Sequence, residues 1–488
     1  MFKKTKNFFS HKSTLKTLAA ILVFLLGIFL RLWKYPYYPF VGHAEEYLFV
    51  WSGLSLIEKG VPISWNDLPV YGEKNIYWTG VAPNSGPSQG GIGVRLLKPW
   101  LDEPPIFSLI VGGISKLYNL PNFTVISSYV IRIPSLIFSF TVMLFLFLLT
   151  RKLFDYQIAL ISLLFYAITP TFIFGSRLAV PENMITMLMV ICLWLMVNYL
   201  ENSKKWQRNL AVILAVLAGL AKPTGFLLVP FVSFFVFKER RWSEGLKILL
   251  TGTILFLGPF LAYGAYFDWE LFKKVIAIQG TRPAGWSSLA YIFTNPGFSV
   301  EIFLDCLIVL GFFSLIFLIF KKNKTKGEEI IVFSFVYALL VTAISGGKHD
   351  QLAWYRYPMY PFMSVTMALL IKEVISFPTF EASALVIPLL IGNIDLLENP
   401  FFKFNFILQS TWFRAVFLFL LLPSIFSLVF KHKFWLELSK VSIIFSLAIA
   451  ILVNFWVVKT RFNILCDHEH CPLPQKIDLF EPIKVNKK

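Results

Sequence analysis

Two adjacent carboxylates, Glu45 and Glu46, have the position in the sequence that best suits a catalytic role. They follow the first hydrophobic segment of the chain, and apolar residues then recur at helical spacing, among them Tyr47, Trp51 and Leu54. This spacing predicts an amphipathic helix at a membrane surface, with both acids in its first turn, where the helix dipole favours their ionised form. Such an acid could take a proton from a hydroxyl group, although acids in a first turn are also ordinary helix-capping residues.

A basic segment late in the chain is suited to binding an anionic group. It contains Lys348, His349 and Asp350, and Arg356 follows shortly after. Ammonium and guanidinium groups at an interface can hold a phosphate, and arginine can do so with two hydrogen bonds. Contact with lipid headgroups is the alternative. The aromatic residues around Arg356 are interpreted as the interfacial belt of a membrane span: Trp354, Tyr355, Tyr357 and Tyr360.

Other charged residues stand at the ends of hydrophobic segments. The acids are Asp102, Glu103 and Glu182, and the bases are Arg132, Arg177, Lys222 and Arg282. Arg177 and Glu182 are close in the sequence, on either side of a predicted turn, and could simply pair with each other.

Cys466 and Cys471 enclose His468 and His470 near the C-terminus. Two cysteines and two histidines suggest a metal site, but their spacing differs from the usual structural zinc patterns. On the outer side of a membrane a local disulfide between Cys466 and Cys471 is the favoured interpretation.

The composition places all these residues in a membrane protein. Of the 488 residues 57% are hydrophobic and only 15% are charged, and the mean hydropathy is +0.68. A soluble domain of this size does not have such a composition. The net charge of +17 does not indicate a nucleic-acid partner, because the lysines and arginines form short clusters between apolar runs, as expected from the positive-inside rule.

The predicted fold is an all-α polytopic membrane protein with about 11–13 transmembrane helices. A basic N-terminus, 1–16, is expected in the cytoplasm, and no small-residue cleavage site follows the first apolar segment, so that segment is expected to be a retained span. The transmembrane domain is predicted to cover 17–460. Its expected spans are 17–33, 129–150, 156–174, 183–200, 209–221, 224–237, 246–266, 302–320, 329–345, 358–375, 384–398, 415–430 and 441–459.

Alternation of these spans predicts one topology in the plasma membrane. It puts the densest basic clusters on the cytoplasmic side with the N-terminus, at Arg151, Lys204, Lys238, 321–326 and Lys431. The predicted outer segments are 35–128, 267–300, 345–357 and the tail 461–488. The short spans 209–221 and 224–237 could instead be a pair of partial depth, which leaves the later sides unchanged.

The first outer segment is expected to carry two interfacial helices. The first begins at Glu45, and a glycine-rich loop over 80–93 follows it. The second lies within 98–120 and starts at Pro104 and Pro105, since proline is favoured in a first helical turn and the apolar part is too short to span comfortably.

No Walker loop, dinucleotide-binding glycine motif or nucleophile elbow occurs in the sequence. An enzyme of this kind must therefore use a donor that is already activated and already in the membrane.

Several short motifs, taken in order, resemble the C-type glycosyltransferases. The similarity is to the branch that contains the protein O-mannosyltransferases and the aminoarabinose transferases. It covers roughly 40–240, with a thinner match near 345–362. The matching pieces are the acidic pair followed by Gly60, Glu103 with its two prolines, YVIRIPSLIFSF over 129–140, SRLAVPEN over 176–183, GLAKPTGFLLVP over 219–230 and RYPMYPF over 356–362.

The resemblance implies a reaction in which a sugar moves from a polyprenyl-phosphate carrier to an acceptor hydroxyl on the outer face, with inversion. The family's first-loop acid is usually Asp followed by Glu, which maps onto Glu45 and Glu46; this chain departs from the family by having Glu first. The resemblance implies that Glu45 is the base and that Lys348, Arg356 and Lys222 stabilise the leaving phosphate. Asp102 or Glu103 could bind a divalent metal or the acceptor, and no other cofactor is expected. The sugar and the acceptor stay unassigned.

Two other classes of protein fit the composition. A transporter or flippase of lipid-linked sugars would need charges inside spans, of which Asp305 is an exceptional example here. A membrane scaffold without catalytic activity is the third class.

Overall fold

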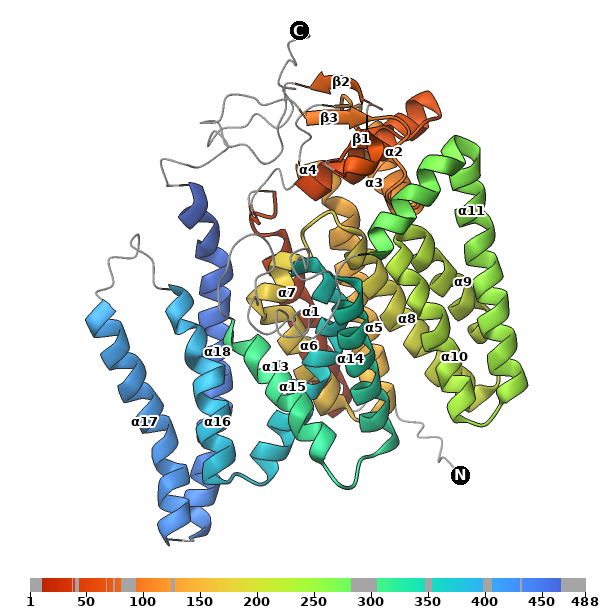
Figure 1. The fold of residues 1–488 in the computed structure, drawn as a ribbon. Helices are drawn as coiled ribbons and strands as arrows, with labels where there is room; N and C mark the ends of the chain where they lie inside the picture. The colour runs from red at the N-terminus through yellow and green to blue at the C-terminus, as the bar shows by residue number, and fades with distance from the viewer. Residues whose placement is uncertain are drawn as a thin grey trace.

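The computed structural model describes residues 11–36, 38–39, 44–66, 68–72, 75–79, 94–123, 128–281, 305–346, 353–397, 406–430 and 432–466. These residues form a bundle of helices, and the elements of the first loop lie together at the upper end of the bundle in Figure 1. We call this the first-loop end. The predicted fold class, an all-α polytopic membrane protein, is confirmed.

A helix is found at each predicted span. The helices are α1 (His11–Leu32), α4 (Ser128–Ile131), α5 (Ile133–Leu153), α6 (Tyr156–Ile168), α7 (Pro170–Gly175), α8 (Pro181–Asn202), α9 (Lys205–Ala221), α10 (Leu228–Lys238), α11 (Trp242–Gly280), α13 (Cys306–Phe320), α14 (Lys326–Ser345), α15 (Tyr360–Ser376), α16 (Phe380–Ile391), α17 (Phe406–Phe430) and α18 (Lys433–Cys466). Among the described residues, eight helices are long and apolar enough to cross a membrane by themselves. The others are shorter apolar helices packed among them.

Three short 3₁₀ helices join these elements. They are η3 (Pro223–Leu227) between α9 and α10, η4 (Ala353–Met359) before α15, and η5 (Gly392–Leu397) after α16. Helix α11 extends beyond its predicted span into the segment 267–300 that was expected to be a loop. Its backbone is kinked at Asp268, whose carboxylate accepts the Leu271 N–H at 3.0 Å and so restarts the helix.

The first loop is more structured than its sequence suggests. Helix α2 (Ala44–Lys59) and helix α3 (Pro105–Leu117) occur where interfacial helices were predicted, and Pro105 begins α3. Between them lie η1 (Pro69–Tyr71) and a small antiparallel sheet of strands β1 (Ser64–Trp65), β2 (Asn75–Thr79) and β3 (Val94–Leu97), in the order β1-β3-β2. The sheet was not predicted, because these strands are short and have little alternation.

Helices α2 and α3 pack with their backbones in contact. Tyr47, Trp51 and Leu54 on the predicted apolar face of α2 are all buried. The close approach depends on Gly53, because a Cβ there would lie 1.8 Å from the Ser108 carbonyl oxygen of α3. The absence of a side chain at Gly53 therefore lets α2 lie directly against α3, which in turn sets the position of the N-terminal turn of α2.

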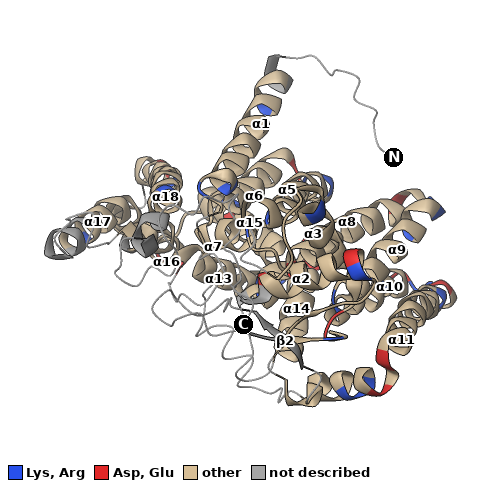
Figure 2. Ribbon diagram, turned by 90° about the horizontal axis from the view of Figure 1, so that it is seen from above, with Lys and Arg blue, Asp and Glu red and all other residues tan. Residues whose placement is uncertain are grey.

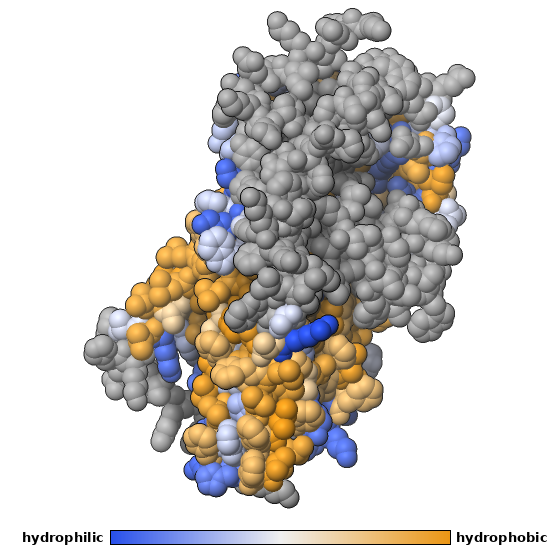
Figure 3. All heavy atoms as spheres, turned by 90° about the vertical axis from the view of Figure 1, so that its left-hand side faces the viewer, coloured by the Kyte–Doolittle hydropathy of each residue, from blue (hydrophilic) through white to orange (hydrophobic). Residues whose placement is uncertain are grey.

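The basic clusters gather at the end of the bundle opposite the first loop, where ion pairs join neighbouring helices. Lys152 pairs with Glu201, Lys238 with Glu329 at 2.7 Å and Lys326 with Glu239 at 2.7 Å. Viewed down onto the first-loop end, most of the ribbon carries no charge (Figure 2). The side formed by α16–α18 presents a broad hydrophobic surface (Figure 3), as expected for contact with lipid. The position of the ion pairs at one end of the bundle agrees with the predicted topology, in which the basic clusters share one side of the membrane.

Replacing Gly53 by Ala should destabilise the protein by about 1–3 kcal/mol, because the new methyl group forces α2 away from α3. Gly113→Ala on α3 is the matched control, since a Cβ there would meet no atom within 4 Å. Thermal unfolding of both purified variants in detergent compares them. Equal melting temperatures for the two variants would contradict the packing argument.

Candidate active site

A buried ion pair between Glu46 and Arg132 fixes the start of α2. The Arg132 guanidinium donates from Nε to Glu46 Oε1 at 2.9 Å and from Nη2 to Oε2 at 2.8 Å. The Ala179 N–H also donates to Oε1, at 2.9 Å. The side chains of Glu46 and Arg132 are 1% and 0% exposed, so Glu46 is a fixed link between α2, the start of α5 and the turn before α8.

Two arginines hold the chain that connects α1 to α2. Arg132 Nη1 donates to the Tyr35 and Pro39 carbonyls at 2.7 and 3.0 Å. Arg177 donates to four carbonyls at 2.6–3.1 Å, those of Leu30, Arg31, Trp33 and Tyr38. Arg177 thus satisfies carbonyl groups that the last turn of α1 leaves free. The suggested pairing of Arg177 with Glu182 is therefore wrong.

Glu182 instead pairs with Lys222, which lies between α9 and η3. The Lys222 ammonium is 2.7 Å from Glu182 Oε1 and 3.7 Å from Glu103 Oε1, and it lies 4.4 Å from the centre of the Tyr355 ring. Burial by itself lowers the pKa of Lys222, but Glu182, Tyr355 and Glu103 raise it by more, so its pKa is above the ordinary value. The ammonium therefore stays charged throughout the physiological pH range.

Asp102 belongs to the same region through the first loop. The Tyr71 hydroxyl donates a hydrogen bond to the Asp102 carboxylate and accepts one from the Leu101 N–H at 3.0 Å. Burial raises the pKa of Tyr71 well above its usual value, and the Asp102 carboxylate raises it further. The phenol therefore stays protonated, and it ties η1 to the segment just before α3.

A cavity joins these groups. Its polar wall comes from the first loop and the end of α9, and its other walls come from α11, α14 and η4. Asp102, Glu103, Lys222, Gln279, Ser345 and Tyr355 are among the residues that line it. Elements far apart in the sequence thus meet around one ammonium group.

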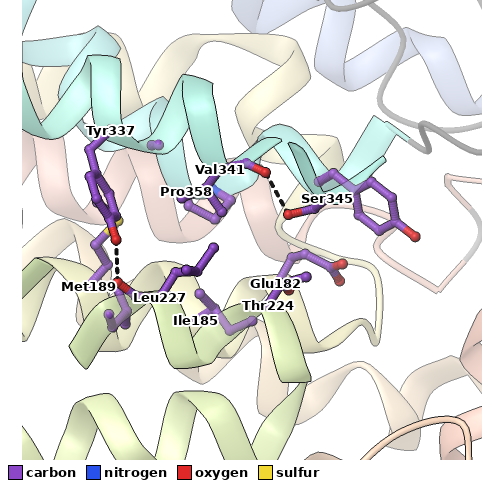
Figure 4. Close-up of a pocket in the computed structure, with 12 residues that line it drawn as sticks. Glu182, Ile185, Met189, Thr224, Leu227, Tyr337, Val341, Ser345 and Pro358 are labelled. Carbon is purple, nitrogen blue, oxygen red and sulfur yellow. Dashed lines mark hydrogen bonds between the residues drawn. The ribbon is translucent and has the colours of Figure 1, made fainter. Parts of the chain in front are cut away.

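A second, mostly apolar pocket adjoins the first. It shares Thr224, Ser345 and Tyr355 with the polar cavity and has Glu182 on its wall. Its apolar lining comes from α8, η3, α10, α14 and η4, and includes Ile185, Met189, Leu227, Tyr337, Val341 and Pro358 (Figure 4). Glu182 therefore lies where a polar cavity meets an apolar slot.

The predicted site residues are only partly described. Glu45 is the second residue of α2, and its side chain lies outside the described part of the structure. Cys466 ends α18, and its side chain is likewise outside, as are the whole of Cys471 and Lys348. The predicted disulfide and the predicted role of Lys348 therefore stay predictions.

Arg356 is described, and it lies at the same end of the bundle as Glu46. It is buried in η4, and its neighbour Tyr357 lies within electrostatic range of Arg356, Glu46 and Glu182. The start of α2, the turn before α8 and η4 thus lie near one another in the described part of the chain.

Two contributors were missed in the sequence. Tyr355 was interpreted as part of an interfacial belt, but its ring lies against the Lys222 ammonium. Gln279 falls in a segment expected to be a loop and reaches the cavity because α11 continues past its kink. No local pattern in the sequence indicated either contact.

Replacing Glu46 by Gln should reduce stability by about 3–5 kcal/mol, because Arg132 would be left buried without its counter-charge. Arg132→Gln should have a similar effect, and the double variant should lose much less than the sum of the two, as measured by a denaturation cycle in detergent. The exposed pair Lys116–Glu58, at 2.7 Å between α3 and α2, is the control and should contribute less than about 1 kcal/mol. Additive losses for Glu46 and Arg132 would contradict this account.

Comparisons with known proteins agree with this arrangement. Residues 102–263 match the family model of the dolichyl-phosphate-mannose-protein mannosyltransferases. An uncharacterized protein of Aquifex aeolicus (strain VF5) is 30% identical over 225 residues. That alignment covers 43% of this chain and 42% of the relative, so the two match over less than half of either length.

Solved structures extend the similarity to nearly the whole chain. ArnT from Cupriavidus metallidurans bound to undecaprenyl phosphate has a TM-score of 0.51 at 12% identity, covering 92% of this chain and 78% of that one. The arabinosyltransferase EmbB from Mycobacterium smegmatis has a TM-score of 0.51 at 12% identity, covering 94% and 42%. The match over 102–263 and the shared architecture confirm the resemblance drawn from the sequence: this chain has the fold of the C-type glycosyltransferases.

Proposed function

We propose that this protein is a membrane glycosyltransferase that moves a sugar from a polyprenyl-phosphate donor to an acceptor hydroxyl on the outer face, with inversion. The observation that carries this proposal is the docking of the start of α2 beside the cavity around Lys222. Glu46 reaches the Ala179 N–H, and Glu182 follows three residues later in the next helix. The backbone of the neighbouring acid, Glu45, is therefore held near the turn before α8, which supports Glu45 as the base.

The two pockets suit the two parts of such a donor. The slot between α8, α10 and α14 has the apolar lining expected beside the first part of a polyprenyl chain, whereas the cavity lined by Lys222 and Gln279 has the polar groups that a sugar phosphate requires. The ArnT structure that shares this fold holds undecaprenyl phosphate, which supports a donor of this class. The phosphate would lie where the two pockets meet, beside the Lys222 ammonium.

The reaction we propose is a single displacement. The Glu45 carboxylate takes the proton of the acceptor hydroxyl while the oxygen of that hydroxyl attacks the anomeric carbon of the sugar. The bond from that carbon to the phosphate oxygen breaks, and the lipid phosphate leaves with the electron pair. Arg356, Lys348 and Lys222 stabilise the charge that develops on the phosphate.

Glu46 has a different role from Glu45 in this proposal. At 1% exposure its carboxylate cannot meet an acceptor from solution, and Arg132 and Ala179 already bind both of its oxygens. Glu46 is therefore a positioning residue, which fixes the orientation of the first turn of α2 and with it the backbone of Glu45.

Asp305, the charge inside a predicted span that a transporter would need, is hydrogen-bonded within the fold. Asp305 accepts hydrogen bonds from the Thr171 N–H at 3.0 Å, the Thr171 hydroxyl at 2.8 Å and the Asn393 amide at 2.9 Å. It also caps α13 by accepting the Leu307 N–H at 3.0 Å. An acid bound on all sides by fixed donors has a structural role, and it does not favour the transport alternative.

Glu45→Gln should lower sugar transfer by about 10²–10⁴-fold, because the amide cannot accept the acceptor's proton. The measurement uses membranes containing the variant and a radiolabelled polyprenyl-phosphate sugar pool, and counts label that becomes covalently attached to acceptors. Glu58→Gln, at the far end of the same helix, should transfer at the wild-type rate. Unchanged transfer by Glu45→Gln would remove Glu45 as the base.

A further inference from the structure

Glu103, which the sequence offered with Asp102 as a metal ligand, faces an ammonium group in the folded protein. Glu103 and Glu182 come from opposite walls of the site, and Lys222 lies between them, 3.7 and 2.7 Å from their nearer oxygens. Asp102, on the same wall as Glu103, receives the Tyr71 hydroxyl. Within the described part of the chain, no three His, Cys, Asp or Glu side chains are arranged to hold a metal ion.

The position of the ammonium conflicts with a metal ion on the Glu182 oxygen that Lys222 contacts. Magnesium and calcium bind carboxylate oxygens at about 2.0–2.6 Å. A divalent ion on Glu182 Oε1 would therefore need nearly the volume that Lys222 Nζ occupies at 2.7 Å, and the two positive charges would repel each other. Both Lys222 and Glu182 are buried, so neither can turn aside into solvent.

We propose that the Lys222 ammonium is the fixed cation of this site and takes the place of a divalent metal ion. This inference rests on the proposed function and gives Lys222 a specific part in it. An ammonium group has three N–H donors. One donates to Glu182, a second faces Glu103, and the third is available to the departing phosphate.

The surroundings of Lys222 suit this role. Glu182 and Glu103 keep the ammonium charged, and the centre of the Tyr355 ring lies 4.4 Å from it. The extended backbone at Lys222, followed by Pro223, ends α9 and holds the side chain's origin fixed. A built-in charge of this kind is preorganised and needs no ion from solution.

The first test uses the unmodified full-length protein in detergent or nanodiscs. Titration with Mn²⁺, followed by electron paramagnetic resonance, should show no stoichiometric site, and transfer in excess EDTA should stay within about twofold of the untreated rate. One Mn²⁺ bound per chain, lost in Glu182→Gln, would overturn the proposal, and so would a tenfold or greater loss of transfer in EDTA.

The second test removes the charge. Lys222→Met should lower transfer by about 10²-fold or more and should create a Mn²⁺ site, because Glu182 and Glu103 would lose their counter-ion. Added Mn²⁺ should then restore part of the transfer. Lys222→Arg should bind no Mn²⁺, since it keeps the positive charge. Lys238→Met, whose partner Glu329 lies at the opposite end of the bundle, is the matched control and should behave as the wild type.

The outcomes separate the two proposals. Failure of Lys222→Met to bind Mn²⁺ would overturn the inference that Lys222 fills a cation's place. If neither the wild type nor any variant transfers sugar, the proposed function fails. The Mn²⁺ titrations of the wild type and Lys222→Met still decide the role of Lys222. The first test does not use Lys222→Met, so a Lys222→Met protein that fails to fold leaves that test decisive.

Discussion

The structure depends above all on the buried bidentate ion pair between Glu46 and Arg132. An isolated charge in an apolar bundle is strongly unfavourable, so each of these groups requires the other at a fixed distance. Because Arg132 stands at the start of α5 and Glu46 in the first turn of α2, their pairing determines where the first loop sits on the bundle. The rest of the site is built outward from that contact.

Backbone carbonyls complete the same network. Arg132 and Arg177 together donate to six carbonyls between Leu30 and Pro39, which no regular element would otherwise satisfy. Pro36, Tyr38 and Pro39 in the irregular chain after α1 can therefore be buried. The Gly53 contact then holds α2 against α3, so the second acidic segment, at Asp102 and Glu103, is placed on the wall of the same cavity.

Charge balance explains why so many acids can gather at this end of the bundle. Lys222 lies between Glu182 and Glu103, and Tyr71 donates to Asp102, so each of the three acids faces a donor or a positive charge. The apolar slot begins directly beside this polar group. A ligand with a charged head and a long apolar tail matches that combination, which neither pocket alone would indicate.

The sequence by itself determined the membrane class, the helix at each predicted span and the two helices of the first loop, because hydrophobic length, 3.6-residue periodicity and proline position are local properties. Only the tertiary structure decided the partner of each charge. Glu182 meets Lys222 rather than Arg177, and Glu46 meets Arg132; these pairs join residues 40 and 86 positions apart. Such contacts depend on how the helices pack and on the direction in which each side chain points, because successive residues of a helix are rotated by about 100°. The order of residues along the chain does not reveal how the helices pack.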